Sequence, residues 1–474
     1  MGEKTDLVRL AADMARLAQG GLPVVLAVSH SDVGGSRRHI DDLARLLHGH
    51  ARHLLMVPHT ILGHRVGNMV DILWNQPGES FHIVLDYETD HSLLLDFFRA
   101  IGVSRIHYHH LLGWDASVRD LPRELEVPFD FTAHDYYSFC PRIHLMTPDG
   151  GYCGEDGEGQ CRRCLEDHPA AKGGSIETWR ANSAAFLERA ARVFAPSFDV
   201  AGRLRRHFPD AALVTAWHPE PTPPQPPLPK PLPEAGRPLV IAVLGAMSRH
   251  KGADTLEACA RDAKKRGLPL SFELIGHAYR RLSVRPRSAL TVHGRYREQE
   301  LQGLLRAVSP HIVWFPARVP ETYSFTLSEA LRSALPVVVP NLGAFPERVA
   351  DRPESYVVPW DMRPEDINDW FMAYRGKKAR SLEKPAVRTP AFSYPADYLR
   401  PAPSPAARKT GPPAPEELLR AARKNRAYVD RKTTAFRILF HAVGKRLLRA
   451  SRQVAKRTRK AARGLLGRFR RQAS

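Results

Sequence analysis

Residues 320–340, PETYSFTLSEALRSALPVVVP, carry two carboxylates, Glu321 and Glu329, eight positions apart and just before a run of valines. Residues 326–335 are rich in helix formers and Pro336 cannot continue a helix, so the pattern predicts a loop, a helix and then a strand. A short β-branched run is typical of a parallel strand that is buried on both faces. We therefore expect Glu321 in the loop before the helix and Glu329 about one turn inside it.

The two carboxylates flank the N-terminus of the predicted helix. A helix N-terminus that opens onto a crevice offers free backbone N–H groups and a positive dipole to an anion, above all to a phosphate. The pair therefore indicates a phosphate site. Two structural interpretations remain open. Thr326 and Glu329 fit the capping-box pattern, in which the acid binds the first amides of its own helix, and Glu321 fits an ordinary solvated loop acid.

The surrounding sequence predicts two α/β domains. In residues 1–218 the predicted strands lie at 21–30, 52–58, 81–87, 104–110, 127–135, 191–197 and 212–218, separated by mainly helical or loop-like segments. A proline-dense linker follows at 219–237. The pattern then restarts in residues 238–400, with strands at 239–245, 270–276, 290–294 and 311–317 and a final segment that crosses back to the first domain. Two such parallel units place a ligand cleft between the carboxyl ends of their strands.

The loops after the predicted strands carry basic residues and no standard nucleotide fingerprint. Neither glycine loop matches G-x-G-x-x-G, and the chain has no G-x-x-x-x-G-K-[ST], which weakens the dinucleotide and ATPase interpretations. SRHKG at 248–252 instead places Arg249 and Lys251 between a strand and a helix, where they suit neutralisation of a diphosphate. Basic residues in such loops are more often only solvated, so the pair gains its value from sharing a predicted cleft with Glu321 and Glu329.

An ordered set of motifs runs through both predicted domains. GAMSRHKG, ELIG, VHGRY, the E-x(7)-E pair, ALPVVVP and LGAFPE lie within residues 241–349, and HSDVGGSRRHIDDLA and FTAHDYYSFCP lie upstream. Between residues 20 and 365 this set resembles the retaining glycosyltransferases of family 4, group 1 glycosyl transferases. The resemblance implies an α/β protein with the GT-B fold, in which two Rossmann-like doubly wound domains face each other across a cleft.

The resemblance also implies an activity. A retaining, metal-independent glycosyltransferase of the hexosyltransferase class would move a sugar from a nucleotide-diphosphate sugar to a glycan or lipid-linked saccharide, in cell-surface polysaccharide synthesis. Glu321 would face the hydroxyls of the donor sugar, Glu329 would hold the nucleotide ribose, and Lys251 and Arg249 would hold the diphosphate. The implied catalytic residues are Glu321 and His134, and the implied donor-binding residues are Arg249, Lys251, Glu329, Gly34 and Gly35. The alternative is a catalytically silent nucleotide- or glycan-binding GT-B module.

Charge development in glycosyl transfer agrees with these side chains. The reaction builds positive charge on the sugar and negative charge on the leaving diphosphate, and carboxylates and cations match the two. The sequence contains no D-x-D pair to chelate a metal, which argues against the metal-dependent GT-A type. The chain departs from the family pattern at Ala246, where an arginine is usual, and at Ser324 and Ala334, where glycines are common.

IHYHH at 106–110 ends a predicted strand that faces the cleft. A histidine at a strand end is more often a hydrogen-bonded structural residue than a contact to an acceptor. We therefore leave His107, His109 and His110 outside the predicted catalytic set.

Four cysteines, Cys140, Cys153, Cys161 and Cys164, fall within 25 residues of a glycine-rich polar stretch. Their spacing ends in C-x-x-C and suits tetrahedral zinc in a cytoplasmic protein. We interpret this zinc as a structural clip for a long loop, with no catalytic role. Disulfides or free thiols remain the alternative, and His168 is an alternative ligand.

The charge of the chain is concentrated at its C-terminal end. Residues 401–474 hold 21 Lys and Arg against 3 acidic residues, a net of +18 out of +20 for the 474-residue chain. From Phe436 to Phe469 apolar or small residues recur at helical spacing among Lys and Arg. This predicts a basic amphipathic tail on an anionic membrane surface. A helix docked on a partner, or a disordered tail that binds nucleic acid nonspecifically, remain alternatives.

Location follows from what the sequence lacks. No apolar stretch reaches the roughly 18 residues of a membrane-spanning helix, and the N-terminus lacks the basic-then-apolar order of a secretory signal. We therefore expect a cytoplasmic protein, peripheral on the inner face of the cell membrane. We expect no nucleic-acid partner, because residues 1–400 are nearly neutral and lack the interleaved aromatic and basic residues that read bases.

Overall fold

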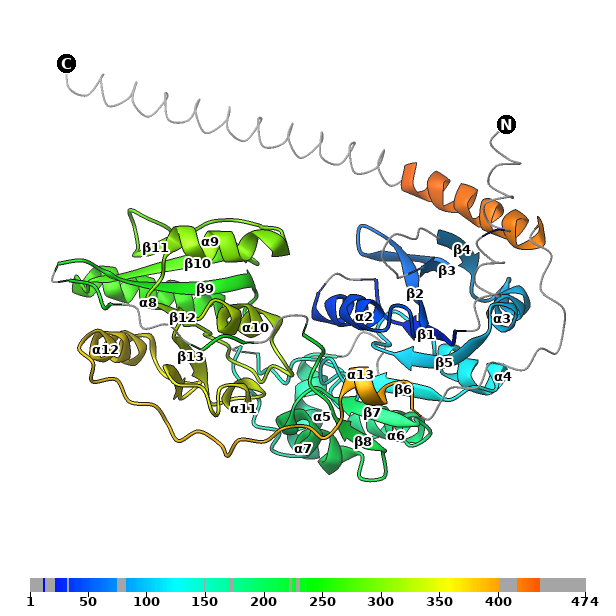
Figure 1. Cartoon of the computed structure of the whole chain (residues 1–474), viewed down its shortest axis with the longest axis horizontal. Coiled ribbons are helices and arrows are strands. Elements are labelled where there is room, and N and C mark those ends of the chain that lie inside the picture. The colour runs from blue at the N-terminus through cyan, green and yellow to red at the C-terminus, as the bar shows by residue number, and fades with distance from the viewer. Residues whose placement is uncertain are drawn as a thin grey trace, which may run out of the picture.

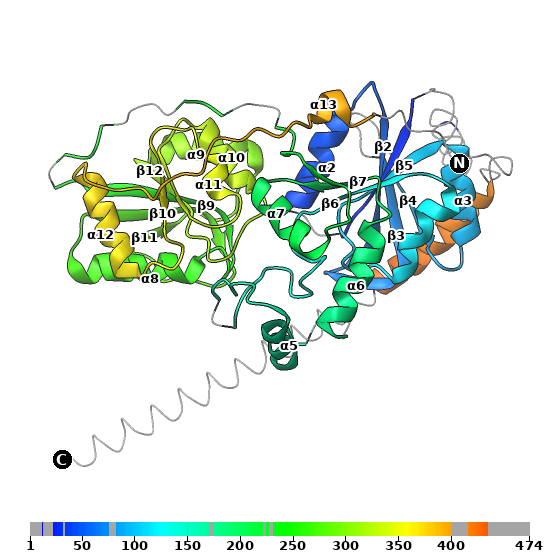
Figure 2. The same cartoon turned by 90° about the horizontal axis from the view of Figure 1, so that it is seen from below.

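The computed structural model has two α/β domains, each built around one mainly parallel sheet, as Figure 1 shows. The described residues are 12, 22–31, 34–74, 82–148, 150–169, 174–220, 224–226, 231–234, 236–400 and 416–434. Figure 2 gives the view from below, with the two domains side by side. The arrangement confirms the GT-B fold that the sequence predicts.

The first domain has an eight-stranded sheet in the order β4-β3-β2-β1-β5-β6-β7-β8. Its strands are β1 (Val24–Val28), β2 (Arg52–Ile61), β3 (His64–Trp74), β4 (His82–Asp86), β5 (Val103–Tyr108), β6 (Phe129–Thr132), β7 (Arg192–Ala195) and β8 (Leu213–Thr215). Its helices are α2 (Gly35–Leu46), α3 (His91–Ala100), η1 (Ala116–Asp120), α4 (Leu121–Leu125), α5 (Glu158–Asp167), α6 (Ile176–Leu187) and α7 (Phe198–His207).

Strand β3 corrects the sequence prediction, which has no strand between 58 and 81. It pairs antiparallel with both β2 and β4, while the other neighbours in this sheet are parallel. Leu62 and Gly63 form the connection to β2 with φ of 50° and 80°, the left-handed pair that a two-residue hairpin requires. A scheme of parallel strands joined by helices has no place for such a hairpin, and the strand was missed for that reason.

The second domain has a six-stranded sheet in the order β11-β10-β9-β12-β13-β14, with every neighbouring pair parallel. Its strands are β9 (Leu239–Met247), β10 (Leu270–Ala278), β11 (Leu290–Val292), β12 (Ile312–Trp314), β13 (Val337–Pro340) and β14 (Ser355–Val358). Its helices are α8 (Ala253–Arg266), η2 (Glu298–Glu300), α9 (Leu301–Val308), α10 (Phe325–Arg332), α11 (Phe345–Arg348) and α12 (Pro364–Arg375).

The strand order of each sheet reverses once, and the reversal positions the loops that matter. In the second sheet it reverses between β9 and β12, so the connections that leave these strands diverge and open a crevice. The loop at 248–252 follows β9, and the loop at 315–324 follows β12. In the first sheet the reversal lies between β1 and β5, beside the glycine loop that leads into α2.

Direct hydrogen bonds join the two domains. The Glu347 carboxylate of α11 accepts the backbone N–H groups of Phe198 and Asp199 at 2.9 and 3.0 Å, at the first turn of α7. A carboxylate at a helix N-terminus satisfies amides that have no partner inside the helix. Across the cleft, the Thr322 hydroxyl donates to the backbone oxygen of His134 at 2.6 Å.

Beyond α12 the chain crosses back to the first domain, as the sequence predicts, and forms α13 (Tyr394–Asp397) there. Tyr394 and Tyr398 are buried against Val25 and Phe194 of the first sheet. The Tyr398 hydroxyl also lies 2.8 Å from Nδ1 of His107. Residues 376–400 are thus a crossover segment that runs from the second domain to the core of the first.

Residues 416–434 form a further helix, the orange one in Figure 1, packed on the first domain. Val429 joins a small apolar cluster with Val66, Met69 and Val84, and Asn425 donates to Asp90 at 2.6 Å. This part of the predicted tail therefore belongs to the first domain. The amphipathic pattern from Phe436 onward lies outside the described residues. Within the described ranges, no helix has the length and apolar character that crossing a membrane requires.

The two positions at which this chain lacks the usual glycines bracket α10. Ser324 has φ 74° and Ala334 has φ 57°, both in the left-handed region that glycine enters without a Cβ penalty. We predict that Ala334→Gly raises the free energy of unfolding by about 1 kcal/mol, because it relieves this strain. Ala330→Gly, inside the same helix, should lower it by about 1 kcal/mol. Urea titration of both variants measures the difference, and equal destabilisation by both would contradict the prediction.

Candidate functional site

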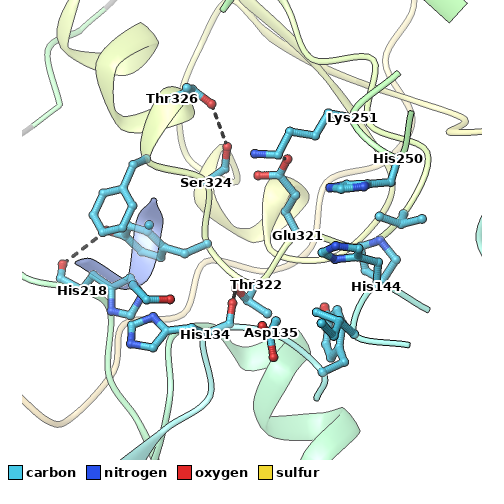
Figure 3. Close-up of a pocket in the computed structure, with 18 residues that line it drawn as sticks. His134, Asp135, His144, His218, His250, Lys251, Glu321, Thr322, Ser324 and Thr326 are labelled. Carbon is cyan, nitrogen blue, oxygen red and sulfur yellow. Dashed lines mark hydrogen bonds and ion pairs between the residues drawn. The ribbon is translucent and has the colours of Figure 1, made fainter. Parts of the chain in front are cut away.

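A cavity of about 360 Å³ lies between the two domains. Its walls are the segments that follow β6, β8, β9 and β12, together with the first residues of α2 and α10 (Figure 3). Four of the predicted site residues line it: Gly35, His134, Lys251 and Glu321. Residues that lie up to 286 positions apart in the sequence therefore meet in one cavity, where the carboxyl ends of the two sheets face each other.

Glu321 and Lys251 face each other across this cavity. The Lys251 ammonium lies 3.4 Å from the Glu321 carboxylate, and Figure 3 shows both side chains pointing into the opening. The backbone of Glu321 is fixed from behind, because its oxygen accepts the N–H of Ala344 at 2.9 Å. Gly343, with φ 63°, makes this approach possible: a Cβ there would lie 2.5 Å from the Glu321 oxygen.

The end of the cavity at α10 is suited to an anion. Ser324, Phe325 and Thr326 line it at the start of the helix, and in this described segment the Ser324 side chain does not cap the helix amides. The positive end of the helix dipole therefore adds to the Lys251 charge. Gly252, next to Lys251, packs on β12's loop so closely that a Cβ would lie 1.9 Å from the oxygen of Pro316. This glycine allows the lysine loop to lie against the Glu321 loop.

Glu329 is not among the residues that line the cavity. It is buried, and its carboxylate accepts Arg38 of the first domain at 3.0 Å and Gln302 at 3.1 Å, with a further ion pair to Arg332. The carboxylate thus binds side chains, and the helix begins after Ser324, so the capping-box interpretation is wrong. In this structure Glu329 joins the two domains through Arg38.

The other two predicted donor-binding residues lie at the rim. Arg249 is about half exposed, donates to the backbone oxygen of Pro148 at 2.9 Å and lies 3.7 Å from Asp254. It thereby ties a loop of the first domain to the second domain. Gly34 is exposed, while Gly35 lies against the Phe325 ring. Asp32 and Val33, in the same glycine loop, lie outside the described residues.

A cluster of histidines surrounds the His134 ring, and no motif of the sequence predicts it as a unit. Its members come from three strands or their ends, one helix and the end of the first domain. Five are buried, His39, His53, His107, His109 and His218, and His134 is half-buried. Nε2 of His134 lies 3.4 Å from Nδ1 of His39 and 3.0 Å from Nδ1 of His109. Helical and strand periodicity can mark a position as buried, but it does not show that these rings contact one another, because the contacts form only in the folded sheet.

The structural interpretation of IHYHH is confirmed for two of its histidines. His107 hydrogen bonds to Tyr398 at 2.8 Å and to Thr132 at 2.7 Å, and His110 pairs with Asp135 at 2.7 Å. His109 instead contacts His134. Burial lowers the pKa of His134 and of His109 well below the ordinary range, so both rings are neutral at neutral pH. His134 therefore lines the cleft as an uncharged ring.

Neutral imidazoles are also the form that binds metals. Among the described residues, His39, His109 and His134 are the group of three whose ring nitrogens all lie within 4.8 Å of one another. The four clustered cysteines are not part of the cleft. Cys140, Cys153, Cys161 and Cys164 line a separate cavity of about 260 Å³ next to α5.

Comparison with known proteins finds a family match within the second domain. Residues 238–370 match the family described as glycosyl transferases group 1. No curated protein sequence matches the chain.

Solved structures show a distant similarity in fold. Sucrose-phosphate synthase from Thermosynechococcus elongatus is 16% identical with a TM-score of 0.45, covering 89% of this chain and 100% of that one. HepE from Anabaena in complex with UDP-glucose is 12% identical with a TM-score of 0.48, covering 75% and 90%. A glycosyltransferase from Rickettsia africae is 13% identical with a TM-score of 0.48, covering 76% and 89%.

The histidine cluster predicts how stability depends on pH. Burial lowers the pKa of His39 to about 3 and that of His53 to about 4. Below the ordinary histidine pKa of about 6.5, the unfolded chain binds protons that the folded chain does not, so stability falls as pH falls. Within the described chain, neither ring nitrogen of His53 has a hydrogen-bond partner, so this residue is the simplest one to replace.

We predict that His53→Leu stabilises the protein more at pH 5 than at pH 8, and that the two gains in the free energy of unfolding differ by about 2 kcal/mol. The reason is that leucine cannot take up the proton that His53 binds at pH 5 only in the unfolded chain. Urea denaturation at the two pH values measures it. The exposed His50→Gln is the control and should leave the pH dependence unchanged. An equal gain from His53→Leu at both pH values would contradict the assignment of a neutral, buried imidazole.

Proposed function

We propose that this protein moves a sugar from a nucleotide-diphosphate sugar to a glycan or lipid-linked saccharide acceptor, with retention of the anomeric configuration. The match of residues 238–370 to glycosyl transferases group 1 supports this proposal. The observation that carries the proposal is the pair Lys251 and Glu321, 3.4 Å apart in the cleft beside the N-terminus of α10. An ammonium with a helix dipole suits a diphosphate, and a carboxylate next to it suits sugar hydroxyls.

The proposed chemistry separates this ion pair. When the donor binds, Lys251 would turn to the diphosphate and Glu321 to the hydroxyls of the sugar. As the bond between sugar and phosphate breaks, negative charge grows on the leaving diphosphate, where the ammonium and the helix amides stabilise it. The same step places positive charge on the sugar ring, which the Glu321 carboxylate favours. These groups supply the countercharge that a metal supplies elsewhere, so we propose metal-independent transfer.

On the first-domain side, neutral His134 would contact the donor sugar near the reacting centre. Its position is well supported, because Thr322, next to Glu321, donates to its backbone oxygen at 2.6 Å. The acceptor would approach over Gly35 and Ser36, which line the same cavity. If Glu329 holds the ribose, as the family resemblance implies, its ion pair with Arg38 must open first. We therefore propose that the donor binds while the domains stand further apart.

We predict that Glu321→Ala lowers transfer at least about 100-fold and leaves the affinity for the nucleotide diphosphate within about threefold, because the carboxylate is proposed to act on the sugar. Thermal shift with a panel of UDP, GDP, dTDP and ADP sugars first identifies the donor, since a ligand of the folded state raises the melting temperature. Radiolabelled transfer from that donor then measures the effect. Glu354→Ala, an exposed acid of the same domain, is the matched control and should keep full transfer.

Two outcomes would contradict this assignment. Transfer at the wild-type rate in Glu321→Ala would remove Glu321 from the catalytic set. Stabilisation of the wild-type protein by a nucleotide sugar without any transfer, hydrolysis or exchange of the donor would favour the alternative of a catalytically silent nucleotide- or glycan-binding module. A role in cell-surface polysaccharide synthesis also belongs to this proposal and is tested by the acceptors that the enzyme elongates.

We further propose that the basic segment after residue 434 holds the protein at an anionic membrane surface on the cytoplasmic side. Truncation after Thr434 keeps the helix that packs on the first domain, so donor binding and transfer to a soluble acceptor should be unchanged. Vesicle sedimentation with anionic lipid should then fall at least about tenfold, because each basic residue near the surface contributes about 1 kcal/mol. Unchanged sedimentation, or sequence-selective DNA binding without vesicle binding, would contradict the proposal.

A further inference from the structure

We propose that Cys140, Cys153, Cys161 and Cys164 bind one Zn²⁺, and that this zinc fixes the strap of residues 140–164 against the second domain at the edge of the cleft. The site lies outside the cavity that holds Glu321 and Lys251. The inference therefore does not rest on the proposed transfer reaction, and its test needs no substrate.

Three segments of the first domain bring the four thiols around one hollow. Cys140 follows the loop after β6, Cys153 follows the isolated bridge between Met146 and Tyr152, and Cys161 and Cys164 lie three residues apart on one face of α5. All four cysteines line the same cavity of about 260 Å³. Figure 2 shows α5 at the lower edge of the molecule, projecting away from both sheets. The first domain thus offers four soft ligands around one cavity, at the edge of its apolar core, against which Cys140 and Cys153 pack.

The groups around the sulfurs compensate negative charge. The Arg142 guanidinium donates to Sγ of Cys164 at 3.1 Å, and that of Arg180 donates to Sγ of Cys161 at 3.4 Å. Zn²⁺ with four thiolates carries a net charge of about −2, which these two cations offset. Four neutral thiols would have no comparable need for two guanidinium groups. The charge balance therefore favours a bound metal over free thiols.

The strap must tighten when the metal binds. Zn–S bonds of about 2.3 Å place the sulfurs about 3.8 Å apart in a tetrahedral site. Among the described residues, the group of three that lies within 4.8 Å is the histidine cluster, so the sulfurs stand further apart than in a filled site. Gly154 and Gly157, both with positive φ, lie between Cys153 and Cys161 and allow the backbone to adjust.

The strap touches the second domain beside the donor cleft. The backbone oxygen of Pro148 accepts Arg249 at 2.9 Å, and His144 stacks on His250 with ring centroids 4.0 Å apart. Both histidines line the cleft cavity, and Lys251 is the next residue in the chain. A zinc at the base of the strap would hold this contact in place. The metal would thus be structural, with an effect on how the two domains meet.

The test uses the full-length protein purified without added metal. Elemental analysis should give about one zinc per chain, and Cys161→Ser and the double variant Cys161→Ser/Cys164→Ser should lose it. Cys259→Ser is the matched control, because Cys259 lies on the buried face of α8 in the second domain, and this variant should keep the zinc. A chelator titration followed by thermal unfolding should show a lower melting temperature once the zinc has left.

A second set of variants leaves all ligands in place. Arg142→Gln and Arg180→Gln should each weaken zinc affinity by about tenfold, as loss of groups that support metal ligands commonly does. Exposed Arg162→Gln, on the same helix as Cys161 but outside the cavity that the cysteines line, should have no effect. Protein that contains no zinc and has all four thiols titratable would overturn the proposal. So would zinc retained in the double cysteine variant, or bound iron with visible absorbance.

Discussion

The site of this protein depends on the reversal of strand order between β9 and β12. Parallel strands send their following loops to the same edge of the sheet, and at a reversal these loops diverge and leave a crevice. Lys251 leaves β9 and Glu321 leaves β12, so the two charges meet although 70 positions separate them in the chain. The close packing of Gly252 on Pro316 and of Gly343 on Glu321 holds both loops at the distance that the ion pair requires.

The first domain completes the cleft with a cluster of histidines, and burying these imidazoles lowers the stability of the domain. Burial of several imidazoles in one cluster is unfavourable for their charged forms and leaves some ring nitrogens without partners, as for His39 and His109 within the described chain. Such a cluster adds little to folding and is expected where a site needs neutral hydrogen-bonding groups at fixed positions. His134 fits this description, because its ring lies in the cluster while its backbone binds Thr322 of the other domain.

Contacts between the domains come from charged and polar side chains more than from an apolar core. Arg38 pairs with Glu329, Glu347 caps α7, and Arg249 binds the strap at Pro148. Polar interfaces of this kind can open and reform, which suits a cleft that must admit a ligand and then enclose it. The chain itself limits that motion, since residues 376–400 cross back and bury Tyr398 in the first domain.

Sequence alone determined the local structure around the valine run and the motifs of the second domain, where residues 238–370 match glycosyl transferases group 1. The helix formers before Pro336 predict a helix, and the β-branched run after it predicts a buried strand, from local sequence preferences alone. Glu321, Lys251, Gly35 and His134 were identified from motifs and do line one cavity. The tertiary structure alone decided that Glu329 binds Arg38, that 64–74 is a strand, and that six histidines from five segments meet at the cleft. Each of these depends on which distant element is the neighbour, and periodicity records only whether a residue is buried, not what it is buried against.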